Sequence, residues 1–385
     1  MAQGVTIFAE MSALAVETGA LNLGQGFPDG DGPEAVLQAA QQAIRDGVNQ
    51  YPPGRGMPVL REAIAAHRQR FWGEQWDSET EVLVTAGATE AIAASLLALV
   101  GPGDEVLTGE PFYDAYAAVV RLAGGSHTTV PLRLVEGRFV LDHDDLRAAF
   151  TSRTKVVLLN NPNNPTGFQF SRDDLTVLVE QAARHGATIV ADEVYEHLCF
   201  DAEHIPVSGI AGARERTIAI GSAGKTFSVT GWKIGWITAP AELVDRVVQV
   251  KQWLTYVNGA PFQPAVAVGL GLGDNYFVGA RESLRARRDL LGAALDAAGF
   301  GVITPSAGYF TVADASPLGI TDGASACREL AHQVGVVGIP YSAFCWPSTA
   351  QGRSWIRFAQ CKDEQTIRLA AERLQAIPHP GRKGP

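Results

Sequence analysis

The decisive stretch is Thr217-Ile218-Ala219-Ile220-Gly221-Ser222-Ala223-Gly224-Lys225-Thr226, in which an apolar strand-like run leads into a turn of small residues that presents one lysine. The hydroxyl of Ser222 lies three residues before Lys225, and a second cation, Lys233, follows eight residues after it. A lysine amine can condense with an aldehyde, so the stretch predicts a covalent cofactor anchor. The alternative is a turn with two solvated lysines, since lysine side chains are mostly exposed.

Around this stretch, short β-branched runs alternate with helical periodicity. We expect strands at 82–85, 105–108, 127–130, 155–160, 188–191, 217–220 and 234–238, and helices at 89–100, 114–123, 142–150 and 171–185. This alternation predicts an α/β fold with a mostly parallel sheet flanked by helices, in which ligands bind beyond the carboxyl ends of the strands. Lys225 follows such an end.

The length of 385 residues exceeds the usual size of a single core, so we expect one large and one smaller domain. Helical patterns at 33–46 and 57–71 precede the α/β part. A charged helix at 276–298, whose arginines we expect to be exposed, precedes strands at 309–313 and 355–359 and helices at 324–334 and 363–377. The expected segments are an N-terminal segment that joins the small domain (1–35), a large cofactor-binding domain (36–270) and a small α+β domain with the long helix (271–385).

Composition excludes several classes of function. The net charge is −10 and no long Lys/Arg run occurs, which argues against nucleic acid and anionic membranes as partners. The apolar run at 91–100 is too short to span a bilayer. The four scattered cysteines suit packing in a reducing compartment, and the first 19 residues lack the basic start of a signal peptide. We therefore expect a cytoplasmic protein whose partners are small molecules and copies of itself.

Two further turns follow expected strands. Thr85-Ala86-Gly87-Ala88-Thr89-Glu90 places small residues at a helix start, where backbone N–H groups bind phosphate and Gly87 permits close approach; an ordinary strand-to-helix turn is the alternative. Asn160-Asn161-Pro162-Asn163-Asn164-Pro165-Thr166-Gly167 holds two Asn-Pro steps, which predicts a rigid turn that directs an Asn amide into a cleft.

Two charged residues complete the pattern. Asp192, in Asp192-Glu193-Val194-Tyr195, ends an expected strand; it suits a protonated ring nitrogen, although a helix N-cap is the common alternative. Arg357, in Trp355-Ile356-Arg357-Phe358, lies within an apolar strand and needs an acidic partner. A bidentate substrate carboxylate and an internal salt bridge are both open as that partner.

Together these motifs, in this order, resemble the class I aminotransferases of the fold type I family, which use pyridoxal 5′-phosphate (PLP), over nearly the whole chain. The resemblance implies that Lys225 forms an imine with the cofactor and moves the proton during catalysis, and that Asp192 holds the ring nitrogen protonated. It implies that Asn164 and Tyr195 hydrogen-bond the phenolic oxygen of the cofactor and that Tyr113 and Val194 cover its two ring faces. The phosphate would be bound by Gly87, Ala88, Thr89, Ser222, Lys233 and, from a neighbouring subunit, Tyr51. The substrate carboxylate would be bound by Arg357 and the backbone of Gly26, and Phe8 would lie at the substrate entrance. A homodimer is therefore implied.

Within the family, Gly-Gln-Gly-Phe-Pro-Asp (24–29) and Gly-Trp-Lys-Ile-Gly-Trp (231–236) resemble the kynurenine and glutamine branch. The runs at 260–265 and 342–345 are similar to bacterial N-succinyldiaminopimelate aminotransferases, enzymes of lysine biosynthesis. Phe8 stands where the family often has Trp. Tyr256 keeps the aromatic of the kynurenine pocket, but Val257 stands where that branch has a histidine.

The resemblance therefore implies transfer of an amino group between an L-amino acid and a 2-oxo acid, with glutamate and 2-oxoglutarate as one pair and N-succinyl-LL-diaminopimelate as the preferred substrate. A broad-specificity glutamine, methionine or kynurenine aminotransferase and a cysteine-conjugate β-lyase stay as alternatives. A non-catalytic PLP-binding regulator would carry a basic DNA-binding module, and we find none before Phe8.

Overall fold

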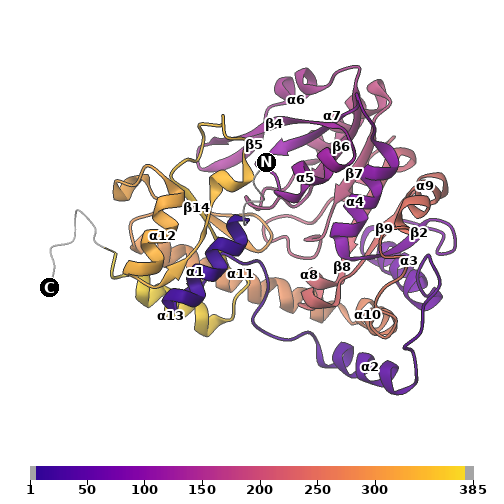
Figure 1. Cartoon of the computed structure of the whole chain (residues 1–385), viewed down its shortest axis with the longest axis horizontal. Coiled ribbons are helices and arrows are strands. Elements are labelled where there is room, and N and C mark those ends of the chain that lie inside the picture. Colours follow the sequence, from indigo (N-terminus) through magenta and orange to yellow (C-terminus); the bar gives the residue numbers. More distant parts are fainter. Residues whose placement is uncertain (1–5, 378–385) are drawn as a thin grey trace.

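A computed structural model describes residues 6–377, which form a large sheet and a smaller one, both flanked by helices, and a separate pair of two-residue strands (Figure 1). The eight strands of the large sheet lie in the order β2 (Val82–Ala86), β9 (Ile234–Thr238), β8 (Thr217–Ser222), β7 (Thr188–Asp192), β6 (Thr154–Asn160), β3 (Glu105–Glu110), β4 (Ser126–Val135) and β5 (Arg138–Leu141). β9 runs antiparallel to both of its neighbours and β5 to β4, and the other pairs are parallel. The predicted α/β fold with a mostly parallel sheet is confirmed.

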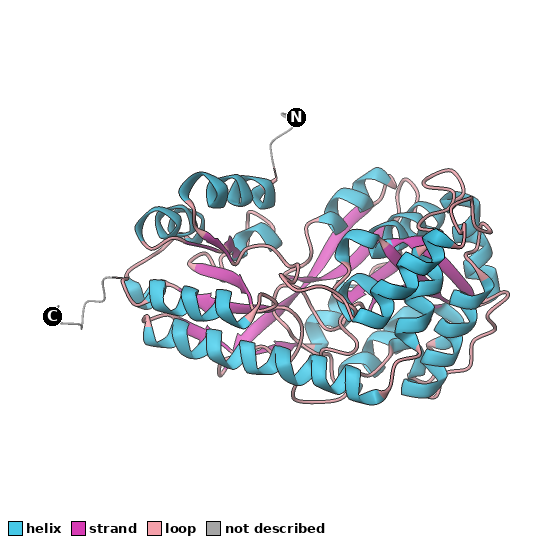
Figure 2. Cartoon of the chain, turned by 90° about the horizontal axis from the view of Figure 1, so that it is seen from below, coloured by secondary structure: helices cyan, strands magenta, loops and turns pink. Residues whose placement is uncertain are grey.

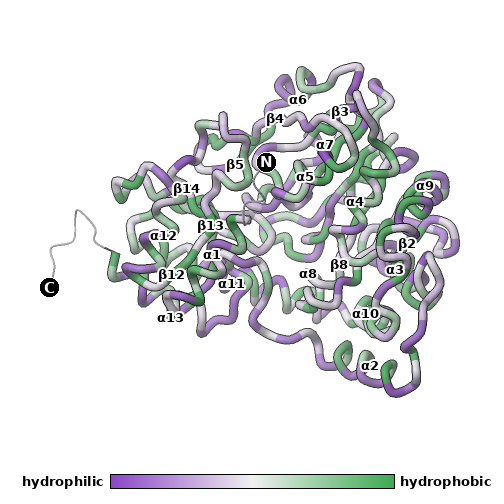
Figure 3. The backbone as a smooth tube through the Cα atoms, viewed as in Figure 1, coloured by the Kyte–Doolittle hydropathy of each residue, from purple (hydrophilic) through white to green (hydrophobic). Residues whose placement is uncertain are grey.

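Helices cover both faces of this sheet because side chains along each strand alternate between the faces. Leu107 and Val157 pack in one core with α6 (His143–Ala149) and α7 (Arg172–His185). Their neighbours Val106 and Val156 pack in another with α4 (Gly87–Leu99), α5 (Ala115–Leu122) and α9 (Ala241–Lys251). The outer helices carry both hydrophobic and hydrophilic residues, as α2 (Glu34–Arg45) shows in Figure 3.

Three helices close the end of the large sheet at β2. α3 (Pro58–Trp72), α10 (Phe262–Leu270) and the short α8 (Ala223–Thr226) bury apolar side chains with β2 and β9. The strands and helices expected between 82 and 238 all occur, within two residues of their predicted ends except β4, which extends five residues further than predicted.

The small sheet consists of antiparallel strands in the order β10 (Gly301–Ile303), β11 (Phe310–Asp314), β14 (Trp355–Ala359) and β13 (Ile339–Pro340). The N-terminal segment joins this part: β1 (Leu21–Asn22) pairs with β12 (Val336–Val337), and α1 (Ile7–Thr18) packs in the same core as α12 (Gly323–Gln333) and α13 (Glu364–Leu374). The long helix α11 (Asp274–Ala297) runs from the large part along the small one (Figure 2). The exact domain boundaries stay a prediction.

One expectation for α11 is wrong. Arg288 is buried, and its Nη1 donates to the carbonyl of Pro305 at 3.1 Å and lies 3.5 Å from Asp201. It lies on the helix face that packs on the small sheet, so its guanidinium satisfies the buried carbonyl of Pro305 and also pairs with the exposed carboxylates of Asp201 and Asp289. In 6–377, no helix has the length and apolarity needed to cross a bilayer. All four cysteines are free, and three of them are buried.

Candidate active site

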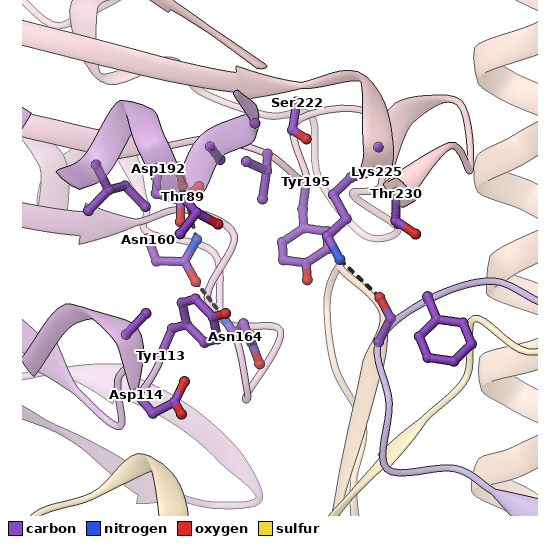
Figure 4. A pocket seen from close by; sticks show the side chains of 18 of the residues that line it. Thr89, Tyr113, Asp114, Asn160, Asn164, Asp192, Tyr195, Ser222, Lys225 and Thr230 are labelled. Atoms are coloured by element: carbon purple, nitrogen blue, oxygen red, sulfur yellow. Dashed lines mark hydrogen bonds between the residues drawn. The ribbon is translucent and has the colours of Figure 1, made fainter. Parts of the chain in front are cut away.

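A cavity of about 680 Å³ lies where the carboxyl ends of β2, β6, β7 and β8 meet the small sheet and the N-terminal segment. Asn160 of β6, Asp192 of β7, Ser222 of β8 and Thr89 at the start of α4 converge on it (Figure 4), and Arg357 and Phe310 of the small sheet complete its lining. Every site residue expected from the sequence lines this cavity except Tyr51: Phe8, Gly26, Gly87, Ala88, Thr89, Tyr113, Asn164, Asp192, Val194, Tyr195, Ser222, Lys225, Lys233 and Arg357.

Lys225 lies in α8, directly after β8, and its amine points into the cavity (Figure 4). Its Nζ donates to the backbone carbonyl of Gly26 at 2.9 Å. Gly26 is required at this point because a Cβ there would collide with the ring of Phe310. Burial lowers the pKa of Lys225 to about 8. At pH 7 about a tenth of the amine is therefore neutral and nucleophilic, against less than a thousandth for an ordinary lysine.

Asp192 ends β7 at the floor of the cavity and is buried. The hydroxyl of Tyr116 donates to its Oδ2 at 2.5 Å, whereas its Oδ1 is buried without a hydrogen-bond partner. Burial raises the pKa of Asp192 to about 6, and the hydrogen bond from Tyr116 opposes that rise. A cationic N–H donor at Oδ1 would satisfy the orphaned oxygen and keep the carboxyl ionised.

The next residue, Glu193, takes no part in the cavity. It is fully buried on the other side of the turn, where Nη1 of Arg68 lies 3.1 Å from its Oε2. Although burial opposes it, Arg68 holds the pKa of Glu193 down at about 2. The Asp-Glu pair of the motif therefore divides into one cavity carboxylate and one structural ion pair.

The start of α4 forms one wall of the cavity. Gly87 has a φ of +72°, in the left-handed region, and a Cβ there would lie 3.2 Å from Nζ of Lys233. Lys233, which immediately precedes β9, donates to Oγ1 of Thr89 at 3.4 Å. Ser222 lines the cavity beside them. A cation, a hydroxyl and free N–H groups at a helix start are the donors that an anionic phosphate requires.

Arg357, in β14, is buried and approaches the cavity from the small sheet. Its Nη1 donates to Oδ1 of Asn164 at 2.8 Å and its Nη2 to the carbonyl of Gly24 at 2.7 Å, while its Nε is buried without a partner. The ring of Phe310 lies 3.7 Å from its guanidinium carbon.

No carboxylate of the described residues pairs with Arg357, so the internal salt bridge considered above is wrong. Burial lowers the pKa of Arg357 to about 10, which leaves it charged at neutral pH. A buried cation with neutral acceptors alone is suited to receive a carboxylate from a substrate.

The remaining predicted residues form walls. Tyr113 and Val194 line the cavity, and Tyr195 is buried beside Lys225, with the amine 5.7 Å from the centre of its ring. Phe8 lies at the N-terminal side, 5.4 Å from the guanidinium carbon of Arg357. Tyr51 lies outside the cavity, 84% exposed, in edge-to-face contact with Tyr256.

Two residues that position this site were missed. Tyr116, in α5, lies three residues after Tyr113, which precedes the helix and whose carbonyl accepts from the N–H of Tyr116. This spacing of about one turn could have placed both near Asp192. Asn160 donates through Nδ2 to the backbone carbonyl of Asp192 at 3.0 Å and accepts from the N–H of Asn164 at 2.6 Å. Asn160 therefore links the two turns. Of the asparagines in this motif, the sequence predicts a site role only for Asn164.

Comparison with known proteins decides the family. The family described as aminotransferase class I and II matches residues 18–374. The chain is an aminotransferase of this family. Its fold is therefore that of the PLP-dependent fold type I enzymes, as the resemblance implied.

Three relatives show the breadth of this family. The solved structure of N-succinyldiaminopimelate aminotransferase from Mycobacterium tuberculosis is similar, with 53% identity, a TM-score of 0.95 and coverage of 97% of this chain and 98% of that one. The methionine aminotransferase of Escherichia coli is 37% identical over 97% of this chain and 96% of its own. The kynurenine–oxoglutarate transaminase of Dictyostelium discoideum is 33% identical over 96% of this chain and 94% of its own.

Proposed function

We propose that this aminotransferase binds PLP in the cavity and exchanges an amino group between N-succinyl-LL-diaminopimelate and the glutamate/2-oxoglutarate pair. The observation that carries the reaction class is the convergence of Lys225, Asp192 and Arg357 on one cavity. The substrate rests on the 53% identity with the enzyme of that name.

The residues present fit the cofactor. The orphaned Oδ1 of Asp192 is matched to a protonated ring nitrogen, and the wall formed by Gly87, Thr89 and Lys233 is matched to a phosphate. Tyr113 and Val194 would cover the two ring faces. Asn164 uses its Oδ1 for Arg357, which leaves its amide N–H₂ to donate to the phenolic oxygen together with Tyr195. Burial raises the pKa of Tyr195, so its hydroxyl stays protonated as a donor.

PLP, when bound, supplies an electron sink for the charge that develops at Cα of the donor. Arg357 binds the α-carboxylate of the donor through its planar fork and so fixes the orientation of Cα. Lys225 holds the cofactor before the donor arrives, and its released amine then takes the proton from Cα and returns it. Burial keeps the pKa of Lys225 near neutral pH, where one side chain can accept and release a proton efficiently.

A second copy of this chain completes the site in this proposal. Tyr51 and Tyr256 are more than half exposed, and Trp253, three residues before Tyr256, is 81% exposed, which is unusual for aromatic side chains of a monomer. A homodimer would cover these aromatics and bring Tyr51 to the phosphate of its partner, as the family resemblance implies. Size-exclusion chromatography with light scattering measures this, and a monomer that retains full activity would contradict it.

A panel of amino donors at fixed 2-oxoglutarate tests the substrate. N-succinyl-LL-diaminopimelate should give the highest kcat/KM among donors that include methionine, glutamine, kynurenine and a cysteine conjugate. A higher value for methionine would favour the activity of the 37% identical relative. Release of pyruvate from the cysteine conjugate as the main reaction would indicate a lyase.

A further inference from the structure

The cavity offers few cations to a donor with several carboxylates. Among the described residues that line it, the cations are Lys225, Lys233 and Arg357. In the proposed function, these serve the reacting amine, the phosphate and the α-carboxylate. A carboxylate at the far end of a long donor therefore needs a cation outside this cavity.

A side groove of about 410 Å³ adjoins the cavity along α5. Asp114 and Ala118 line both the cavity and this side groove, so the two spaces meet at these residues. Asp114 lies at that side of the cavity in Figure 4. Asp114, Ala118 and Arg121 follow one another at spacings of four and three residues and therefore lie along one face of the helix. The seven residues from Asp114 to Arg121 rise about 10 Å along its axis.

Arg121 is the only cation among the described residues that line the side groove. Within 6–377 the exposed side chain of Arg121 makes no hydrogen bond or ion pair, and the same holds for Arg138, whereas Arg133, Arg147 and Arg153 pair with carboxylates. Side chains in a helix lean toward its N-terminus, which for α5 is the end at the cavity. The guanidinium of Arg121 is therefore available to an anion that enters the groove from the cavity.

The other groove residues provide mostly apolar walls, one carboxylate acceptor and the buried Nδ1 of His127, which has no hydrogen-bond partner among the described residues. His127 and Trp346 lie opposite α5 with their ring centres 5.2 Å apart. Burial lowers the pKa of His127 to about 4, so its ring is neutral and adds no charge. The half-buried carboxyl of Asp114 is the acceptor where the groove leaves the cavity. From the cavity outward, a ligand thus meets an acceptor and then a cation.

We propose that this groove binds the distal arm of an N-acylated amino donor, with Asp114 accepting the amide N–H and Arg121 pairing with the terminal carboxylate of the acyl group. The inference rests on the proposed function and deepens it. In N-succinyl-LL-diaminopimelate, nine bonds separate the reacting carbon from the terminal carboxylate carbon, which corresponds to about 10 Å when extended, as for three backbone residues. This length matches the rise of about 10 Å from Asp114 to Arg121, and the arginine side chain adds further reach.

The test compares kcat/KM for N-succinyl-LL-diaminopimelate with kcat/KM for glutamate. In Arg121→Gln the ratio of the two should fall about tenfold, mainly through a higher KM for the succinylated donor. Ala117 lines the side groove but not the cavity. Ala117→Leu therefore fills the groove without entering the cavity, and it should also lower the ratio. Arg184→Gln, which removes an exposed arginine on α7, is the matched control and should leave the ratio unchanged.

The outcomes separate this proposal from the function on which it rests. If the wild-type protein uses both donors and neither variant changes the ratio, the groove proposal is wrong and the reaction stands. If the wild-type protein does not use the succinylated donor at all, the proposed substrate is wrong, and so is the groove proposal that rests on it. Equal loss for both donors in Arg121→Gln, with unchanged cofactor absorbance, would also contradict a distal subsite.

Discussion

Replacing Arg357 tests the assignment of the carboxylate-binding group. Arg357 is buried, donates through both Nη atoms and makes no ion pair with a carboxylate among residues 6–377, although Asp114 acts on it electrostatically from a longer distance. A substrate carboxylate would therefore supply the counter-charge in direct contact. Removing one partner of a buried charge pair costs about 3–5 kcal/mol. Arg357→Gln should therefore lower kcat/KM for an amino acid by about 10²–10⁴-fold. Arg357→Lys keeps the charge but loses the fork, which removes one charge-assisted hydrogen bond worth about 1.5–3 kcal/mol, or about 10–150-fold.

The assay measures kcat/KM for an amino acid and for the amine that has the same side chain but lacks the α-carboxylate. Loss of Arg357 should lower kcat/KM for the amino acid and leave the slow reaction of the amine nearly unchanged, so the preference between them collapses. Retained visible absorbance of the cofactor shows that the variant is folded. Arg288→Lys, at a buried arginine that serves backbone acceptors and acids away from the cavity, is the control. The reasoning is refuted if Arg357→Gln keeps the preference within threefold of wild type.

Three further perturbations report on the cofactor site. Tyr116→Phe removes the hydrogen bond to Asp192, worth about 1.5–3 kcal/mol for a charged acceptor, so titration of the cofactor-free protein should show about 10–150-fold weaker PLP binding. An unchanged affinity would contradict this. Gly87→Ala places a side chain on a residue in the left-handed conformation, which costs about 1–2 kcal/mol, and brings its Cβ against Lys233. PLP binding should therefore weaken while the preference among amino donors is kept. A changed donor preference would argue against a phosphate-binding role for this wall. Because burial lowers the pKa of Lys225 to about 8, PLP capture by the cofactor-free protein should accelerate about tenfold per pH unit below pH 8 and level off above it; a rate that still climbs at pH 10 would point to an ordinary lysine.

Much of the large sheet could be predicted from the sequence because its central strands are buried on both faces. Runs such as 156–159 and 189–191 are continuously apolar, and strand after strand ends in a polar turn. Because the carboxyl ends of parallel strands lie at one edge of a sheet, the sequence alone predicts that Asn164, Asp192 and Lys225 lie close together. The structure brings them to one cavity.

The small part of the fold was harder to predict, since pairing across the chain decides it. β1, β12 and β13 have two residues each, too few to show a period, and β1 pairs with β12 more than 300 residues away. The acceptors of Arg357 were equally hidden: Gly24 and Asn164 lie in different segments, and only the folded chain joins them. Arg288 reads as one of several exposed arginines because burial of its guanidinium depends on the small sheet beneath it.

The most direct test of the central claim is the visible absorbance of the PLP-loaded protein before and after addition of N-succinyl-LL-diaminopimelate, measured in wild type and in Lys225→Ala. The wild-type protein should show a band that disappears as the amino group is transferred and returns with 2-oxoglutarate, in steps of one equivalent per site. Lys225→Ala should lack the lysine-dependent band and lose at least about 10³-fold in turnover, since the general base alone contributes about 10²–10⁴-fold. A Lys225→Ala protein that turns over at the wild-type rate would contradict the account.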